Sequence, residues 1–307
     1  MKPLLLTHPD CMHHEMPGHP ERPARLSAVM DALARSGISA DMTEILASEI
    51  DDEHVLRVHP EMYLKHIVAS EPASAVIKVD PDTYMSRGST RAAKLAAGAV
   101  AEATTRVLDG EANRAFCAIR PPGHHAEIAS AFGFCLFNSV AIAAELALQR
   151  PDIHRVAICD FDVHHCNGTV DIFKDRPEVL VCSSFQNHFY PHRYLDFSND
   201  HIISTRLDAG TNSKTFRALI ERDWIPNIEK HKPDLIFVSA GFDAHKDDPL
   251  GEICLEDDDF GWISRLLADL SNQYSKGRLI SSLEGGYDLD ALARAAKLHV
   301  ETIITTI

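Results

Sequence analysis

The sequence predicts an α/β protein with a central, mainly parallel sheet that helices cover on both faces. From residue 115 onward, short apolar runs alternate with longer segments of helical periodicity. This alternation is typical of parallel sheets, because parallel neighbours are joined by helical crossovers. The run at 156–159 is continuously apolar and rich in β-branched residues, which indicates a strand buried on both faces. We see neither a repeat nor a low-complexity linker, and therefore expect one domain over residues 1–307.

The N-terminal part of the chain is predicted to be mainly helical. A helical pattern begins at Pro23, and Gly37 suits the position that ends it. Further helices are expected at 51–65 and in the alanine-rich segment 89–108, with a turn at 79–83 between them. Residues 7–21 are rich in His and Pro but lack paired zinc-ligand spacing. We therefore expect an ordered loop near the mouth of a site; the sequence does not define a role for its His-rich part, 8–19.

The alternating region supplies most of the predicted sheet. Strands are expected at 115–119, 156–161, 179–183, 235–239 and 279–283. Helices are expected at 138–148, 169–173, 215–228, 260–274 and 289–304, with capping residues at 211–213 ahead of the third.

The composition argues against several functional classes. The formal net charge of −15 disfavours a general nucleic-acid binder, because phosphate contacts need a basic surface, and it favours cationic ligands. The apolar runs fall short of the roughly 20 residues that span a bilayer, and the N-terminus does not resemble a signal peptide. The seven cysteines are scattered. We therefore expect reduced thiols and a cytoplasmic protein without nucleic-acid or membrane partners.

Ionisable side chains collect where the strand at 156–161 ends. Asp160, Asp162 and His164 occupy every second position, so extended backbone would point all three to one side. Carboxylates and an imidazole beside a buried strand are costly unless a cation compensates them. Taken alone, the stretch could also be an Asp-rich capping turn.

Polar residues also follow the other predicted strands. Parallel strands end at one edge of a sheet, and open α/β sheets bind ligands there, so we expect these residues to meet. They are His124, His125, Ser183, Ser184, Asp243 and Tyr287. Any one of them could be a turn residue or a satisfied core polar group, but stability alone does not explain all of them at one edge.

Three of the residues expected at this edge of the sheet would form a mononuclear metal site. Asp162, His164 and Asp243 offer two oxygen donors and one nitrogen donor and leave positions open for water, which is the mark of a catalytic metal. Zinc in such a site lowers the pKa of bound water to about 7 and polarises a carbonyl. Because the set is rich in oxygen, it would also accept Fe(II), Co(II) or Mn(II).

The surrounding residues suit acid–base catalysis. His124 and His125 would transfer protons. Asp160 and Asn167 would each hold the far ring nitrogen of one of these histidines. Tyr287, which follows two glycines, would donate a hydrogen bond to an oxyanion.

These motifs resemble the zinc-dependent histone deacetylase family, in particular bacterial class II-type histone deacetylase-like amidohydrolases. They are RPPGHHAE at 120–127, GFC at 133–135, DFDVHH at 160–165, GFDAH at 241–245 and EGGY at 284–287. They occur in order over nearly the whole chain, beginning with HPERP at 19–23. The resemblance implies an arginase–deacetylase fold with about eight strands. It also implies hydrolysis of an N-acetyl amide with release of acetate.

The resemblance implies roles for individual residues. Asp162, His164 and Asp243 fall on the zinc ligands, His125 on the general base and acid, His124 with Asp160 on its electrostatic partner, and Tyr287 on the group that polarises the carbonyl. Gly133, Phe134 and Tyr190 fall on the walls of an acyl-lysine tunnel, and Arg22 falls on an internal cavity behind the metal. A structural potassium ion is implied at Asp160, Asp162, His164, Ser183 and Ser184.

The chain departs from the family pattern at a few positions. Ser184 and Phe185 replace the usual Leu-His, Tyr190 replaces a commoner Phe, and Cys166 replaces a common Gly. None of these departures removes a catalytic group, but they affect tunnel width, tunnel polarity and potassium affinity.

Three alternative functions share parts of this pattern. An arginase-like enzyme with two manganese ions would need further carboxylates where this chain has Cys166 and His245. A silent acyl-lysine-binding module need not keep the paired histidines and Tyr287. An acetylpolyamine deacetylase would catalyse the same reaction, but Leu250 occupies the position of an acidic gatekeeper found in polyamine-preferring relatives. We therefore expect N-epsilon-acetyl-lysine in peptides or proteins as substrate, with acetylated polyamines as the alternative; the sequence leaves a homo-oligomer open.

Overall fold

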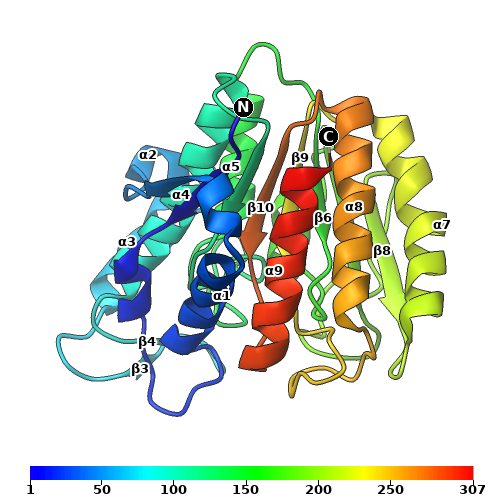
Figure 1. Cartoon of the computed structure of the whole chain (residues 1–307). Helices are drawn as coiled ribbons and strands as arrows, with labels where there is room; N and C mark the ends of the chain where they lie inside the picture. Colours follow the sequence, from blue (N-terminus) through cyan, green and yellow to red (C-terminus); the bar gives the residue numbers. More distant parts are fainter. Residues whose placement is uncertain (307) are drawn as a thin grey trace.

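A parallel eight-stranded sheet forms the centre of residues 1–306, the part of the chain that this computed structural model describes (Figure 1). The strand order is β2-β1-β5-β10-β9-β6-β7-β8, and neighbouring strands are parallel throughout. The strands are β1 (Leu4–Thr7), β2 (Thr43–Leu46), β5 (Arg114–Cys117), β6 (Val156–Asp160), β7 (Val179–Gln186), β8 (Ile202–Leu207), β9 (Leu235–Ala240) and β10 (Leu279–Leu283). This sheet confirms the predicted fold class.

Helices cover both faces of the sheet, as predicted. One face carries α1 (Pro23–Ser36), α7 (Ser213–His231), α8 (Asp257–Tyr274) and α9 (Leu289–Thr305) (Figure 1). The other carries α2 (Asp52–Val55), α3 (Glu61–Ser70), α4 (Ser89–Leu108), α5 (Ser139–Leu148) and α6 (Asn167–Phe173). The short elements are the 3₁₀ helices η1 (Pro9–His13) and η2 (Ile38–Asp41) and the hairpin of β3 (Ile77–Lys78) and β4 (Tyr84–Met85).

The central strand β6 shows why the sheet is buried on both sides. Val156 and Ile158 belong to the core that packs under α2–α6, whereas Ala157 and Cys159 belong to the core that packs under α1 and α7–α9. Successive side chains of a strand point to opposite faces, so a strand covered on both sides must be apolar at every position. The uniform apolar run is the sequence signal of this burial.

Three strands of the main sheet were not predicted, and one predicted helix is divided in two. β1 contributes only three apolar residues, and of the edge strands β2 is mostly exposed and β8 has mixed burial, so none of them shows a continuous apolar pattern. The helix expected at 51–65 is two helices, because Pro60 precedes the first residue of α3 and its ring disfavours a helical residue before it. Gly37 ends α1 with a left-handed φ of 80°, as predicted.

The strand register brings the polar strand ends together. Asp160, the last residue of β6, pairs with Ser183 of β7 and with Ser239 of β9. Leu283 of β10 pairs with Ala240 of β9, so the segments that follow these two strands leave the sheet side by side. In the described part of the chain, all helices are too short or too polar to cross a membrane.

Candidate metal centre and active site

Asp162, His164 and Asp243 converge in the loops that follow β6 and β9. One ligand atom from each lies within 4.8 Å of the other two, and all three side chains are buried. His164 Nδ1 lies 3.0 Å from Asp162 Oδ1 and 3.2 Å from Asp243 Oδ2. Apart from this close approach of His164, Asp243 Oδ2 is buried without a hydrogen-bond partner among residues 1–306. An acceptor left open in this way, beside a second carboxylate and an imidazole, suits a bound cation.

The main chain holds both carboxylates in place. Val163 N donates to Asp243 Oδ1 at 2.8 Å, and Gly285 N donates to Asp162 Oδ2 at 2.9 Å. A Cβ atom at position 285 would overlap both carboxylates, so the metal cradle requires glycine there. The first glycine after β10 is therefore part of the site.

The electrostatics of the three side chains also favour a cation. Burial, together with the charge on Asp162, raises the pKa of Asp243 to about 7. Burial opposes protonation of His164, but the adjacent Asp162 and Asp243 outweigh it and raise its pKa to about 10. Without a metal the cluster holds extra protons, and a divalent ion would displace them.

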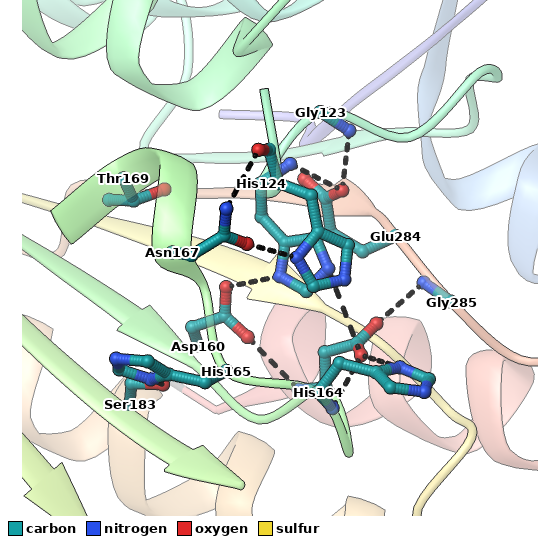
Figure 2. A network of polar contacts seen from close by, with 12 residues as sticks. Gly123, His124, Asp160, His164, His165, Asn167, Thr169, Ser183, Glu284 and Gly285 are labelled. Atoms are coloured by element: carbon teal, nitrogen blue, oxygen red, sulfur yellow. Dashed lines mark hydrogen bonds and ion pairs between the residues drawn. The ribbon is translucent and has the colours of Figure 1, made fainter. Parts of the chain in front are cut away.

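His124 and His125 lie side by side and have different partners, and Figure 2 shows His124 beside its partner Asp160. Their ring centroids are 4.0 Å apart. His124 Nδ1 lies 2.9 Å from Asp160 Oδ2, and His125 Nδ1 lies 2.6 Å from Asn167 Oδ1. These are the two contacts that the sequence predicts. Asp160 therefore holds His124, whereas Asp162 and His164 meet in the metal cluster.

The surroundings separate the pKa values of the two rings. Burial disfavours the charged form of His124, but Asp160 and then Asp162 outweigh this effect and raise its pKa well above the ordinary value. Burial lowers the pKa of His125 well below the ordinary value, and the neighbouring charge on His124 lowers it further. At neutral pH, His125 is thus uncharged beside a cationic His124, which suits a base and an electrostatic partner.

A narrow cavity of about 270 Å³ leads to the metal cluster. It is lined by Asp82, His125, Gly133, Phe134, His164, Phe189, Tyr190, Pro249, Leu250 and Tyr287. The predicted tunnel residues Gly133, Phe134, Tyr190 and Leu250 all lie on its wall. The Phe134 and Tyr287 rings meet edge to face with centroids 5.9 Å apart, and Tyr190 meets His125 edge to face at 5.3 Å.

The turn between β3 and β4 shapes the tunnel wall, a function that the sequence does not indicate. Gly133 N donates to Asp82 Oδ1 at 3.2 Å, and Phe134 N donates to Thr83 Oγ1 at 3.1 Å. Gly133 has a φ of 53°, and a Cβ atom there would overlap the His125 ring. The signal available in the sequence was an Asp-Thr pair inside a turn, which is too common to indicate a site.

The His-rich loop lies beside this tunnel, as expected. The His19 ring packs edge to face on Phe134 with centroids 4.6 Å apart. His14 is buried, and its Nδ1 lies 2.8 Å from Ser89 Oγ. In the described residues, the only side-chain cluster suited to a metal is the one at Asp162.

The expectation that Arg22 lines an internal cavity is wrong. Arg22 is exposed immediately before α1, whereas Arg25, one turn into the helix, is completely buried. Arg25 Nε and Nη2 each donate at 2.5 Å, to the main-chain oxygens of Gly286 and Glu284 respectively. Its guanidinium lies 4.8 Å from the centroid of the Tyr287 ring. The residue that holds the segment before Tyr287 is therefore Arg25.

The residues expected at a potassium site lie together but have other contacts in the structure. Asp162 N donates to Asp160 Oδ1 at 3.1 Å, and Ser183 Oγ lies 3.0 Å from His165 Nδ1 (Figure 2). Ser184 Oγ is buried without a hydrogen-bond partner in the described chain.

A buried metal cradle, a neutral imidazole and a phenol thus meet at the end of a tunnel at the carboxyl edge of a parallel sheet. The fold and the site together define the class of the protein as a hydrolase.

Comparisons with known proteins identify the family. The model of the histone deacetylase domain matches residues 19–303. A histone deacetylase-like amidohydrolase of Pseudomonas aeruginosa is 35% identical, over 88% of this chain and 73% of its own length. An uncharacterised Synechocystis protein is 36% identical, over 95% of this chain and 94% of its own length. The chain belongs to the histone deacetylase family, as the motifs predict.

Longer relatives and a solved structure agree with this assignment. A type-2 histone deacetylase of Dictyostelium discoideum is 33% identical over 99% of this chain, which spans only 21% of that protein. The crystal structure of the HDA15 HD domain superposes with a TM-score of 0.93 at 30% identity, covering 100% of this chain and 89% of that one.

Proposed function

We propose that this protein is a zinc-dependent deacetylase that hydrolyses N-acetyl amides, with N-epsilon-acetyl-lysine in peptides or proteins as its substrate, and releases acetate. The observation that carries the proposal is the open acceptor Asp243 Oδ2 in a buried Asp/His/Asp cluster beside the neutral His125. Zinc bound by Asp162, His164 and Asp243 would supply a water of pKa about 7 and polarise the substrate carbonyl.

The residues around the metal cluster have separate tasks in the proposed reaction. His125 accepts the proton of the attacking water at Nε2, because its Nδ1 faces Asn167, and later gives a proton to the leaving amine. The charge on His124, held by Asp160, stabilises negative charge that develops on the substrate. The Tyr287 hydroxyl donates to the oxyanion, and burial together with the Asp243 and Asp162 charges keeps its pKa well above the ordinary value despite the opposing charge of Arg25.

The metal requirement tests the proposal directly. We expect one equivalent of zinc per chain, loss of acetyl-lysine peptide turnover on chelation, and recovery when zinc is restored. Metal affinity should fall gradually below about pH 10, where His164 holds a proton in the metal-free site, and more steeply below about pH 7, where the carboxyl of Asp243 is protonated as well, because a protonated ligand cannot bind the ion. Metal analysis and turnover before and after chelation check both points. Two manganese ions per chain, or turnover that survives complete metal removal, would contradict the proposal.

The tunnel lining supports an acyl-lysine substrate over an acetylpolyamine. Leu250 and Pro249 form the wall near Tyr287 and cannot pair with the secondary ammonium of a polyamine. Among residues 1–306, Asp82 is the one carboxylate in the tunnel wall that does not belong to the metal cluster. Asp82 and the net charge of −15 would both attract a cationic substrate, so acetylated polyamines are the second candidate.

We expect kcat/KM on acetyl-lysine peptides to exceed that on acetylspermidine or acetylputrescine. Leu250→Glu should shift the ratio toward the polyamines by roughly tenfold, since a carboxylate would pair with the free ammonium, which is secondary and internal in acetylspermidine and terminal in acetylputrescine. Leu250→Gln, which has a similar shape but no charge, is the matched control. Markedly higher efficiency of the unaltered protein on polyamines would reverse the substrate assignment.

We further propose a structural potassium ion at Asp160, Asp162, His164, Ser183 and Ser184, supported by the unpartnered buried hydroxyl of Ser184 within residues 1–306. Three further statements stay predictions: a single catalytic domain over 1–307, a cytoplasmic location and any homo-oligomer. Residue 307 lies outside the described part of the chain.

A further inference from the structure

A line of polar contacts connects His125 with the segment that carries the tunnel wall. Asn167 Oδ1 lies 2.6 Å from His125 Nδ1, and Asn167 Nδ2 donates to Glu127 Oε1 at 2.8 Å. The second oxygen of Glu127 accepts from Arg193 Nη1 at 2.5 Å. Glu127 is only 6% exposed. None of the catalytic tasks above uses Glu127 or Arg193.

The two ends of the Asn167 amide are chemically different, and their placement matters for His125. The NH₂ group faces two oxygens, Glu127 Oε1 at 2.8 Å and the main-chain oxygen of His125 at 3.3 Å. A flipped amide would place its own oxygen against both acceptors. It would also offer an NH₂ group to His125 Nδ1.

The amide orientation in turn selects the tautomer of His125. With Asn167 Oδ1 as acceptor, the ring proton lies on Nδ1 and Nε2 carries a free lone pair. With the flipped amide, Nδ1 would accept and the proton would lie on Nε2. A ring protonated at Nε2 cannot take a proton from water there.

Glu127 suits this task because a carboxylate accepts at both oxygens. One oxygen serves Asn167 and the other serves Arg193, which also lies 4.9 Å from the centroid of the Phe132 ring. Phe132 stacks in turn on the tunnel residue Tyr190, with centroids 5.4 Å apart. A side-chain amide at position 127 could not serve both neighbours, because one of its ends is a donor.

We propose that Glu127 is a positioning residue that fixes the amide orientation of Asn167 and thereby the Nδ1–H tautomer of His125. This inference rests on the proposed function, in which His125 Nε2 is the base. Arg193 anchors Glu127 from the tunnel-wall segment.

The kinetic test uses Glu127→Gln. The new amide must turn its oxygen toward either Arg193 or Asn167, so we expect kcat to fall by roughly 10- to 100-fold with little change in KM. Adding Arg193→Ala removes the competitor and should restore most of kcat. In an Asn167→Asp background, where the side chain has no distinct ends, Glu127→Gln should cost nothing further.

The matched control is Glu145→Gln. Glu145 is also 6% exposed and pairs with a half-exposed arginine, Arg176, at 2.7 Å, but it touches none of the site residues named here. The Glu145→Gln variant shows what the loss of a buried Glu–Arg pair alone does to kcat, and we expect no change. If Glu127→Gln does not fold, Glu127→Asp serves instead: it keeps both acceptors but withdraws them from Asn167.

Imidazole ¹⁵N NMR of the zinc-loaded protein gives a readout that does not require activity. We expect the His125 signals, assigned by their loss in His125→Gln, to report Nδ1–H in the unaltered protein and a substantial Nε2–H population in Glu127→Gln. An unchanged tautomer in Glu127→Gln, or a kcat no lower than that of Glu145→Gln, would overturn the role of Glu127. A protein that deacetylates no substrate, yet shows the tautomer change, would instead refute the proposed function alone.

Discussion

Replacing His125 by alanine is expected to lower kcat on an acetyl-lysine peptide by roughly 10²- to 10⁴-fold, the range for loss of a general base. The ring is neutral because burial and the His124 charge lower its pKa, and its Nδ1 is engaged by Asn167. Removing it leaves the attacking water without a nearby proton acceptor. Steady-state kinetics at neutral pH measure the effect.

Metal content and KM separate this effect from damage to the site. Both should stay close to those of the unaltered protein, because His125 does not belong to the Asp162/His164/Asp243 cluster. A fall in zinc content would mean that the variant disturbs the cradle, and activity within a few-fold of the original would show that another group acts as base.

Replacing Tyr287 by phenylalanine is expected to lower kcat by roughly 10²- to 10³-fold, the effect of removing one oxyanion donor. The substitution deletes one oxygen and keeps the ring, which packs against Phe134 and under the Arg25 guanidinium. Folding and metal content should therefore be retained, and circular dichroism and metal analysis check them alongside the kinetics. Unchanged turnover would rule out Tyr287 as the oxyanion donor.

Arg25 cannot take over the task of the Tyr287 hydroxyl in the phenylalanine variant. It touches the Tyr287 ring and two main-chain oxygens of the preceding segment, so it supports the phenol without replacing its hydroxyl. The hydroxyl itself has to supply the hydrogen bond to the oxyanion.

The sequence by itself determined the architecture and the metal cluster. Strands buried on both faces are largely apolar, so β6, β7, β9 and β10 stand out in the sequence. Parallel strands end at one edge, and this simple geometry was enough to join Asp162 and His164 with Asp243 across two segments far apart in the chain. The same edge predicted that Asp160 holds one of the two adjacent histidines, and the family resemblance implied that this histidine is His124.

Only the tertiary structure decided what depends on contacts between irregular segments. The edge strands β2 and β8 lack a continuous apolar pattern because one side of each has no neighbouring strand. Arg25 rather than Arg22 reaches Tyr287 because α1 turns that face toward the core. The links from Asp82 to Gly133 and from Glu127 to Asn167 join a turn or loop to residues 40 or more positions away. Turns and loops have no periodicity that would indicate such partners in the sequence, so their contacts became visible only in the folded chain.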